Sequence, residues 1–331
     1  MPRILLTQTI HPQAQARLAE LGDVTVAADT SPDTLRRSAI GCAVVVVRAP
    51  LPADIFDAAQ SLIGAVRHGA GVDMIPLESA TAHGVLVANV PGVNANAVAE
   101  HVLRSMLQLA RNTAAVSAEL CAARGAGWAR ARALADSGFE LRGRTVGVIG
   151  FGHVGQAVAR ICVHGFGMRA LAYTRSALPE GGPAQRVALD ELLAQSDFVV
   201  LACPLTEATR GLIGAPQLAL LRPGAFLINV ARGPVVNEAA LLDSLRSGRI
   251  AGAALDVFDT QPLPDSHPLW QLPQVLLTPH VAGLTEDSML AMGSQAALAV
   301  EHLLRGEVPP HCINPEAAAA FAARRERAQR T

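Results

Sequence analysis

Two side chains suited to acid–base chemistry, Arg232 and His280, follow predicted buried strands. Arg232 comes after the apolar run AFLINV, and His280 comes after VLLT and Pro279. Because ligand crevices of α/β sheets lie at the carboxyl ends of the strands, we expect both side chains at one site. A guanidinium can bind a carboxylate bidentately and polarise an adjacent keto oxygen. An imidazole can give that oxygen a proton or take it back.

A glycine-rich loop follows the predicted strand from Thr145 to Ile149 and opens a predicted helix. Its pattern, GxGxxG, is formed by Gly150, Phe151, Gly152, His153, Val154 and Gly155. In such a loop the first glycine makes a tight turn, the second lets backbone approach a pyrophosphate, and the third lets helix and strand pack closely. The helix N-terminus adds N–H groups and the positive end of its dipole. The loop therefore predicts a dinucleotide site.

The end of the next strand predicts which dinucleotide is preferred. NAD-binding units normally place Asp or Glu there, where the carboxylate accepts the ribose hydroxyls. Here the strand ends at Tyr173 and is followed by Thr174, Arg175 and Ser176. A guanidinium between two hydroxyls suits a 2′-phosphate, which a carboxylate would repel. We therefore expect a preference for NADP(H); the alternative is that Arg175 is a solvated loop residue and NAD(H) binds without its usual acid.

Length and charge narrow the class of protein. With 331 residues the chain is long enough for two domains, and a cleft between domains is the default place for a site. A formal net charge of −1 gives no reason to expect a nucleic-acid or membrane partner. No apolar run approaches the roughly 20 residues of a membrane span, and the N-terminus leads directly into a strand-like segment, so we expect a cytoplasmic protein.

The basic residues and the cysteines exclude several kinds of site. All 27 basic residues are arginine, which excludes a Schiff-base lysine and a Walker-type phosphate-binding lysine. Anions must therefore be bound by arginine or by backbone amides. The cysteines lack a CxxC pair, so we expect reduced core thiols rather than disulfides or a metal site. They are Cys42, Cys121, Cys162, Cys203 and Cys312.

Strand-like and helix-like segments alternate along the chain and predict parallel α/β sheets. The first lobe has strands at ILLT, VTVAA, AVVVVRA, LIGAVRH and VLVANV, and one long helix from Asn96 to about Ala123 leaves it. The second series, TVGVIG, RALAYT, DFVVLAC, AFLINV, AALDVF and VLLT, predicts a six-stranded doubly wound sheet. An amphipathic helix from Glu286 to Arg305 should fold back on the first lobe, and the tail from Glu316 either frays or continues as a helix.

Four further segments carry a family resemblance: HGAGVD at 68–73, NANAVAEH at 94–101, INVARGPVVNEAALLDSLRSGRIAGAALDVF at 228–258 and LLTPHVAG at 276–283. With the glycine loop, their order and spacing resemble the D-specific 2-hydroxyacid dehydrogenase family over nearly the whole chain. The resemblance implies a Rossmann-like doubly wound cofactor domain, residues 98–284, inserted into a flavodoxin-like substrate domain, residues 1–97 plus 285–331. It also implies hydride transfer between a nicotinamide cofactor and a small 2-keto or 2-hydroxy acid, such as glyoxylate or hydroxypyruvate, in a homodimer formed through the cofactor domain.

The resemblance also assigns residues. Arg232 matches the catalytic arginine and His280 the catalytic histidine, amides around Ala70 and Gly71 bind the substrate carboxylate, and Asn94 lies at a polar position near the cleft. Further cofactor contacts are expected from Cys203, Pro204, Thr209, Val230, Ala231 and Asp256.

Three other side chains are further candidates near the predicted site. Arg48, after AVVVV, is either a ligand for a second anionic group of the substrate or a solvated surface side chain. His68 is a candidate for lining the cleft, and His101 is expected to be a packed helix residue.

The chain departs from the family at one catalytic position. The family segment DVFxxEP has a glutamate where this chain has Gln261. An amide can accept the imidazole N–H of His280, but it cannot stabilise imidazolium by charge. Formate dehydrogenases of the same superfamily carry glutamine there, so a formate dehydrogenase is one alternative. A dinucleotide-sensing binding protein, like the corepressors that share the scaffold, is another.

Overall fold

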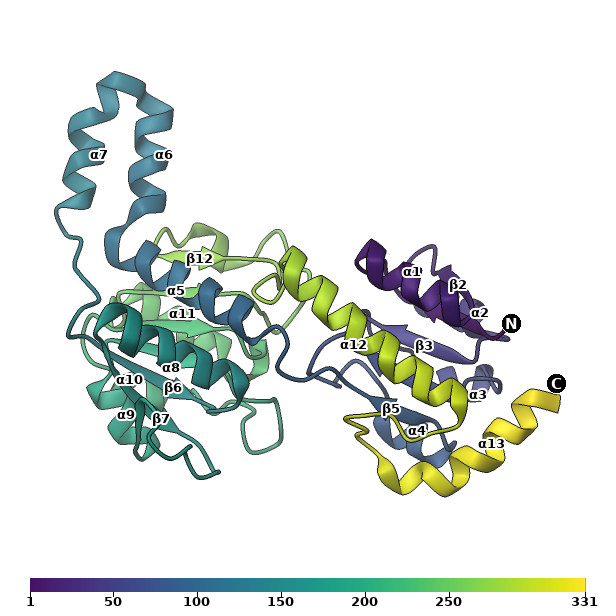
Figure 1. Cartoon of the computed structure of the whole chain (residues 1–331). Coiled ribbons are helices and arrows are strands. Elements are labelled where there is room, and N and C mark those ends of the chain that lie inside the picture. Colours follow the sequence, from purple (N-terminus) through teal and green to yellow (C-terminus); the bar gives the residue numbers. More distant parts are fainter. Residues whose placement is uncertain (331) are drawn as a thin grey trace. The chain divides into compact units, whose positions relative to one another are not determined.

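The structure is a computed structural model that describes residues 1–330. The chain divides into two compact units, which are described separately (Figure 1). Unit 1 consists of Met1–Asn94 together with the segment from Leu284 onward, and unit 2 consists of Ala95–Gly283. Unit 2 is therefore an insertion in the sequence of unit 1.

Unit 1 contains the five-stranded parallel sheet that the first series of β-branched runs predicts. The strand order is β2-β1-β3-β4-β5, and helices cover both faces, each over its own apolar core. The strands are β1 (Arg3–Leu6), β2 (Asp23–Val26), β3 (Val44–Val47), β4 (Gly64–Arg67) and β5 (Leu86–Ala88). The helices are α1 (Pro12–Leu21), α2 (Pro32–Ala39), α3 (Ile55–Ala58), α4 (Leu77–Ala82), α12 (Glu286–Arg305) and α13 (Ala318–Arg330).

Helix α12 packs directly on the sheet of unit 1, as its amphipathic pattern predicts. A Cβ built on Gly64 of β4 would lie 2.4 Å from Leu303 Cδ1, so any larger residue there would force the Leu303 side chain of α12 to move. Thr285 and Ser288 form a reciprocal capping box at the N-terminus of the helix. Both its start at Glu286 and its end at Arg305 agree with the prediction from the sequence.

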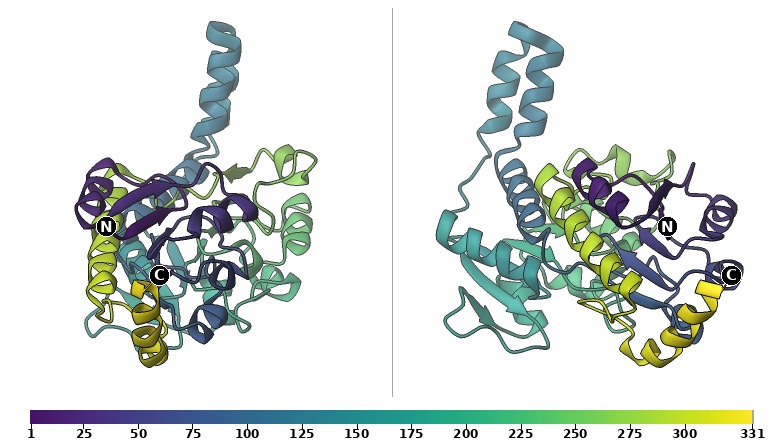
Figure 2. Two further views of the ribbon diagram at one scale, coloured as in Figure 1. Left: turned by 90° about the vertical axis from the view of Figure 1, so that its right-hand side faces the viewer. Right: turned by 45° about the vertical axis from the view of Figure 1, so that its right-hand side comes forward.

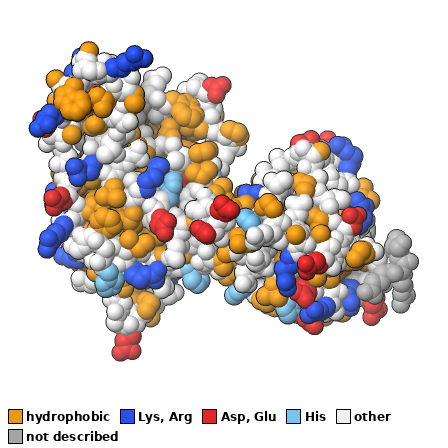
Figure 3. Space-filling model, turned by 45° about the horizontal axis from the view of Figure 1, so that its top comes forward, with side chains coloured by type: hydrophobic (Ala, Val, Ile, Leu, Met, Phe, Trp, Pro, Cys, Tyr) orange, Lys and Arg blue, Asp and Glu red, His pale blue; other side chains and the backbone are white. Residues whose placement is uncertain are grey.

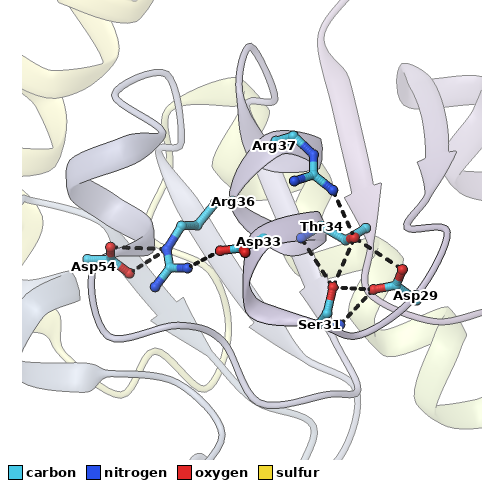
Figure 4. Close-up of polar contacts among 7 residues, drawn as sticks. All are labelled: Asp29, Ser31, Asp33, Thr34, Arg36, Arg37 and Asp54. Atoms are coloured by element: carbon cyan, nitrogen blue, oxygen red, sulfur yellow. Dashed lines mark hydrogen bonds and ion pairs between the residues drawn. The ribbon is translucent and has the colours of Figure 1, made fainter.

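A network of short polar side chains fixes the start of α2 (Figure 4). The Asp29 carboxylate accepts the Ser31 backbone N–H at 2.8 Å, and the Ser31 hydroxyl in turn accepts the Thr34 N–H as N-cap. The hydrogen bonds of the Ser31 side chain and backbone lower the pKa of Asp29. Arg36 forms ion pairs with Asp33 of α2 and with Asp54, the residue that precedes α3. These contacts join α2 to the start of α3, so the network has a structural role.

The C-terminal tail is part of the core of unit 1. Of the two alternatives left by the sequence, the structure has the helix, α13. Arg324 of this helix is only 3% exposed, and its guanidinium donates to four backbone carbonyls at 2.6–3.2 Å. Those carbonyls belong to Phe56, Ala59, Leu62 and His83. Satisfying four otherwise buried acceptors ties the tail to the rest of the unit.

His68, the candidate for lining a cleft, is 3% exposed, so that interpretation is wrong. Its Nε2 has no hydrogen-bond partner within residues 1–330. Burial, with the positive charges of Arg48 and Arg67, lowers the pKa of His68 to about 4. The folded unit therefore holds a neutral imidazole.

We expect the stability of the protein to fall as pH drops from 6.5 toward 4. In that range the unfolded chain protonates His68 and the folded chain does not, so roughly 2–3 kcal/mol is lost by pH 4.5. Urea unfolding at pH 7.5 and 4.5 measures the loss. A His68→Gln variant should show a smaller difference between the two pH values; a difference as large as that of the wild type would contradict the assignment.

Unit 2 contains a parallel sheet of seven strands in the order β12-β11-β10-β9-β6-β7-β8. The sequence predicts six, and the strand that it misses is β8. This strand has the sequence AQR and lies at the sheet edge half-buried or exposed, so it lacks the apolar run by which the others are found. The strands are β6 (Thr145–Ile149), β7 (Arg169–Tyr173), β8 (Ala184–Arg186), β9 (Phe198–Leu201), β10 (Phe226–Asn229), β11 (Gly252–Leu255) and β12 (Val275–Leu277).

The predicted long helix from Asn96 to Ala123 is two helices, α5 (Ala95–Arg111) and α6 (Thr113–Ala123). Asn112 between them has φ 50°, a left-handed conformation that ends α5. Helix α6 and α7 (Trp128–Ala135) lie side by side and project from the rest of unit 2 (Figure 2). The other helices are α8 (His153–Phe166), α9 (Leu189–Gln195), α10 (Ala215–Leu220) and α11 (Glu238–Arg246).

The structure also shows the state of the cysteines and whether any helix could cross a membrane. All five cysteines are free, but Cys121 is exposed on α6, so the expectation of core thiols is wrong for that residue. Within residues 1–330 no helix has the length and apolar character needed to cross a membrane.

Candidate active site

The glycine loop joins β6 to α8 in a conformation that needs its glycines. Gly150 has φ 91°, and a Cβ there would lie 2.5 Å from the Cys203 backbone nitrogen. A Cβ on Gly155 would lie 2.2 Å from the Gly150 carbonyl oxygen, so the first turn of α8 packs on the loop. Phe151 between them is buried in the unit.

Gly152 has open space around it, unlike Gly150 and Gly155. Nothing within residues 1–330 comes within 4 Å of a Cβ built there, and no side chain caps the N-terminus of α8, where His153 and Val154 begin the helix. Open space in front of uncapped N–H groups is what a bound phosphate requires. The loop therefore fits a dinucleotide pyrophosphate.

The loops after β9 and β10 adjoin this turn and contain the other expected cofactor contacts. The Thr209 hydroxyl donates to the Pro204 carbonyl at 2.7 Å and shapes the loop that begins at Cys203. Val230 and Ala231 follow β10, where the Asn229 side chain accepts the Ala231 N–H at 3.0 Å. These bonds hold both loops at the carboxyl edge of the sheet.

Two guanidinium groups lie at the turn after β7. The Thr174 hydroxyl accepts the Ser176 N–H at 3.3 Å, and the Arg175 carbonyl accepts an N–H of Arg186 at 3.4 Å. Arg186 ends β8, a strand that the sequence does not predict, and for that reason the sequence does not predict Arg186 as a cofactor contact either. Among residues 1–330, no carboxylate forms an ion pair with Arg175 or Arg186. The turn therefore offers positive charge and two hydroxyls.

Arg232 lies in a tight turn directly after β10. Its guanidinium donates to the Ala231 carbonyl at 2.7 Å, and its own carbonyl accepts the Asn229 amide at 3.0 Å. A Cβ on Gly233 would lie 2.1 Å from the Phe258 carbonyl carbon, so this turn presses against the segment that follows β11. The arginine is thereby placed beside the segment that contains Gln261.

His280 follows β12 in a left-handed conformation, with φ 57°. Such a conformation is uncommon for a residue with a side chain and persists only where neighbours fix it. The His280 N–H donates to the Asp256 carbonyl at 2.8 Å, and the Val281 and Ala282 N–H groups donate to the Asp256 carboxylate at 2.9 Å. Asp256, expected as a cofactor contact, is 2% exposed and organises the turn that carries His280.

The imidazole of His280 meets the amide of Gln261. His280 Nδ1 lies 3.3 Å from Gln261 Oε1, a geometry in which Nδ1–H donates to the amide oxygen. The Gln261 amide N–H in turn donates to the Phe258 carbonyl at 3.4 Å, which orients its oxygen. The pair is therefore hydrogen-bonded without a carboxylate.

His101, assigned to packing, also reaches this edge of the sheet. Its Nε2 lies 3.3 Å from the Thr278 hydroxyl, although the two residues are 177 positions apart in sequence. No local pattern in the sequence signals this pair.

The candidate residues of unit 1 lie at the carboxyl ends of β3 and β4. Within the described chain nothing accepts the N–H of Ala70 or Gly71, whereas both carbonyls are occupied, by Asn89 and Arg67 respectively. Two free amides in a glycine-rich turn can bind a carboxylate. Asn94 is the last residue before unit 2 and is partly buried.

Arg48 is not a freely solvated side chain. Its guanidinium donates to the Thr9 carbonyl, and burial lowers the pKa of Arg48.

Comparisons with known proteins place these features in a family context. Residues 103–282 match the family model described as D-isomer specific 2-hydroxyacid dehydrogenase, NAD binding domain. The chain is 37% identical over 320 residues to D-3-phosphoglycerate dehydrogenase of Methanocaldococcus jannaschii, which covers 95% of this chain but only 60% of that relative. It is 36% identical over 327 residues to glyoxylate reductase of Thermococcus onnurineus, which covers 95% of this chain and 96% of that relative.

Two solved structures are also similar to this chain. An NADPH-dependent glyoxylate/hydroxypyruvate reductase from Sinorhizobium meliloti superposes with a TM-score of 0.82 and 30% identity, covering 95% of this chain and 99% of that chain. A protein from Thermus thermophilus gives a TM-score of 0.82 and 33% identity, with coverage of 94% and 99%.

Proposed function

Because the chain belongs to the D-isomer specific 2-hydroxyacid dehydrogenase family, we propose that it transfers a hydride between a nicotinamide cofactor and a short 2-keto or 2-hydroxy acid such as glyoxylate or hydroxypyruvate. The observation that carries this proposal is the hydrogen-bonded pair His280–Gln261 beside the Arg232 turn, in the unit whose glycine loop fits a dinucleotide. Near-complete mutual coverage with a glyoxylate reductase supports the short substrate.

Each polar group has a role in this reaction. A bound nicotinamide dinucleotide supplies or accepts the hydride. Arg232 binds the substrate carboxylate and polarises the keto oxygen. His280 donates a proton to that oxygen from Nε2, while Gln261 holds Nδ1–H and thus the ring orientation. In unit 1, the family resemblance makes the amides of Ala70 and Gly71 candidates for binding a substrate carboxylate, Asn94 a candidate polar contact, and Arg48 a candidate for binding a second anionic group.

We also propose that NADP(H) is preferred. Thr174, Arg175 and Ser176 provide hydroxyls and a guanidinium at the position where an NAD site has its acid, and Arg186 brings a second guanidinium to the same turn. We include Arg186 among the residues proposed to bind the 2′-phosphate, because its guanidinium donates a hydrogen bond to the Arg175 backbone carbonyl.

Changing Gln261 to Glu should extend keto-acid reduction toward alkaline pH. A carboxylate beside Nδ1 favours imidazolium and raises the pKa of His280, so the proton donor survives to higher pH. The measurement is the pH profile of kcat/KM for reduction. Gln60→Glu, an exposed change in unit 1, is the matched control. An unmoved profile in the Gln261→Glu variant would show that the two side chains are not coupled in catalysis.

Two other activities have specific support. Gln261 favours a formate dehydrogenase, because oxidation of formate needs no proton on the carbon-bound oxygen. Similarity to D-3-phosphoglycerate dehydrogenases favours a phosphorylated substrate, but the chain spans only about three-fifths of the length of those relatives.

One panel of assays decides among these activities. Purified protein is given glyoxylate, hydroxypyruvate and 3-phosphohydroxypyruvate with NADPH or NADH, and formate with NADP⁺ or NAD⁺. We expect the highest kcat/KM for an unphosphorylated short 2-keto acid. Higher efficiency with formate or the phosphorylated acid would replace the proposal, and cofactor binding without any turnover would favour a dinucleotide-sensing protein.

We further propose a homodimer formed through unit 2. None of the residues of α6 is buried, and Trp128 at the start of α7 is 64% exposed. Figure 3 shows apolar and arginine side chains close together at the end of the view where α6 and α7 lie. Exposed apolar surface of this kind is typical of an interface between chains. Sedimentation at micromolar concentration should give twice the chain mass of 34.4 kDa, and a monomer would contradict the proposal.

A further inference from the structure

We propose that His101 is a positioning residue, which holds the turn of His280 through a directed hydrogen-bond chain from His101 to Thr278 to Asp256. The proposal rests on the function proposed for His280, but the chain of bonds can be tested without turnover. It gives a specific task to a histidine that the sequence suggested was only packed in its helix.

The direction of the chain follows from counting protons. The Thr278 hydroxyl lies 2.6 Å from Asp256 Oδ1 and donates its single proton to that carboxylate. The same hydroxyl oxygen lies 3.3 Å from His101 Nε2. Because its proton is already used, the oxygen can only accept from the imidazole. His101 must therefore carry its proton on Nε2.

Asp256 is the hub at which the chain meets the catalytic turn. Its carboxylate accepts the Thr278 hydroxyl and the N–H groups of Val281 and Ala282, while its backbone carbonyl accepts the His280 N–H. Thr278 precedes His280 by two residues and Val281 follows it. The carboxylate thus grips the left-handed turn on both sides of His280, and His101 fixes the rotamer of Thr278.

The surroundings of His101 favour a neutral donor. Burial lowers the pKa of His101, and Arg104 on the same helix lowers it further, whereas Asp256 acts in the opposite direction. These are the charged groups that influence it, from α5 and from the end of β11. A neutral imidazole with its one proton on Nε2 therefore prevails at neutral pH.

The two links can be removed and restored separately. Thr278→Val deletes the hydroxyl at nearly constant volume, and Thr278→Ser restores it. His101→Leu removes the donor, and His101→Gln places an amide N–H₂ near the position of Nε2. His164→Leu, an exposed histidine on α8, is the matched control.

We expect Thr278→Val and His101→Leu each to lower kcat about tenfold, because losing a hydrogen bond in a charged network misorients the proton donor. The NADPH dissociation constant should stay within about twofold, since the glycine loop is not involved. Serine and glutamine should recover most of the loss. Unchanged kcat in Thr278→Val, or equal losses in kcat and in NADPH affinity without rescue by serine, would overturn the proposal.

A spectroscopic measurement separates this proposal from the proposed function. Long-range proton–nitrogen correlation spectra, assigned with the His101→Gln variant, should show His101 protonated on Nε2 alone in wild type and a mixture of tautomers in Thr278→Val. If this pattern is found in a protein that turns over no 2-keto acid, the proposed function fails and the hydrogen-bond chain stands. Protonation of His101 on Nδ1 in the wild type would overturn the chain whatever the activity.

Discussion

Replacing Arg232 by alanine should lower kcat/KM for the preferred 2-keto acid at least about a hundredfold. The variant loses a charged hydrogen bond to the carboxylate and the polarisation of the keto oxygen, together a few kcal/mol of transition-state stabilisation. The kcat/KM of Arg232→Lys should lie between those of the wild type and of Arg232→Ala, because lysine keeps the charge but cannot form the bidentate hydrogen bonds of a guanidinium. Steady-state kinetics at saturating cofactor measure the effect.

The exposed Arg246 of α11 provides the matched control for this experiment. Arg246→Ala removes the same charge from the same unit and should leave kcat/KM within about twofold. Turnover of Arg232→Ala close to that of the wild type would mean that another group binds the carboxylate. In that case the free amides of Ala70 and Gly71 are the next candidates.

The combined change Thr174→Asp, Arg175→Ala should reverse the cofactor preference. The wild type is expected to prefer NADPH, and the variant should shift the NADPH/NADH ratio of kcat/KM by at least about a hundredfold, because a guanidinium is replaced by a repelling carboxylate. Arg186→Ala alone should weaken use of NADPH and leave NADH nearly unchanged. A wild-type preference for NADH, or an unaltered ratio in the double variant, would show that this turn does not read the 2′-phosphate.

Much of the fold follows from local patterns in the sequence. The alternation of β-branched runs with helical segments predicts both parallel sheets, which the structure confirms, because strands covered on both faces must be apolar throughout. The bounds of α12 are predictable because a threonine cap and a following glycine mark its ends. Local patterns do not predict strand β8, which is held by pairing with β7 rather than by an apolar run. They also do not predict the break at Asn112, because helical periodicity does not reveal a single left-handed residue.

Residue identity and spacing were enough to predict that Arg232, His280 and the glycine loop lie at one edge of a sheet, since each follows a strand and parallel strands end at a common edge. Gln261 was found only through the family resemblance. Contacts between distant segments required the tertiary structure. Only the sheet order β12-β11-β10 shows that the turn of Arg232 presses on the segment of Gln261. Only packing of α5 against the sheet brings His101 to Thr278, and only the burial of His68 makes it a neutral core residue. The physical reason is that composition and periodicity report which residues a segment buries, whereas hydrogen-bond partners and pKa values depend on which other segments arrive beside it.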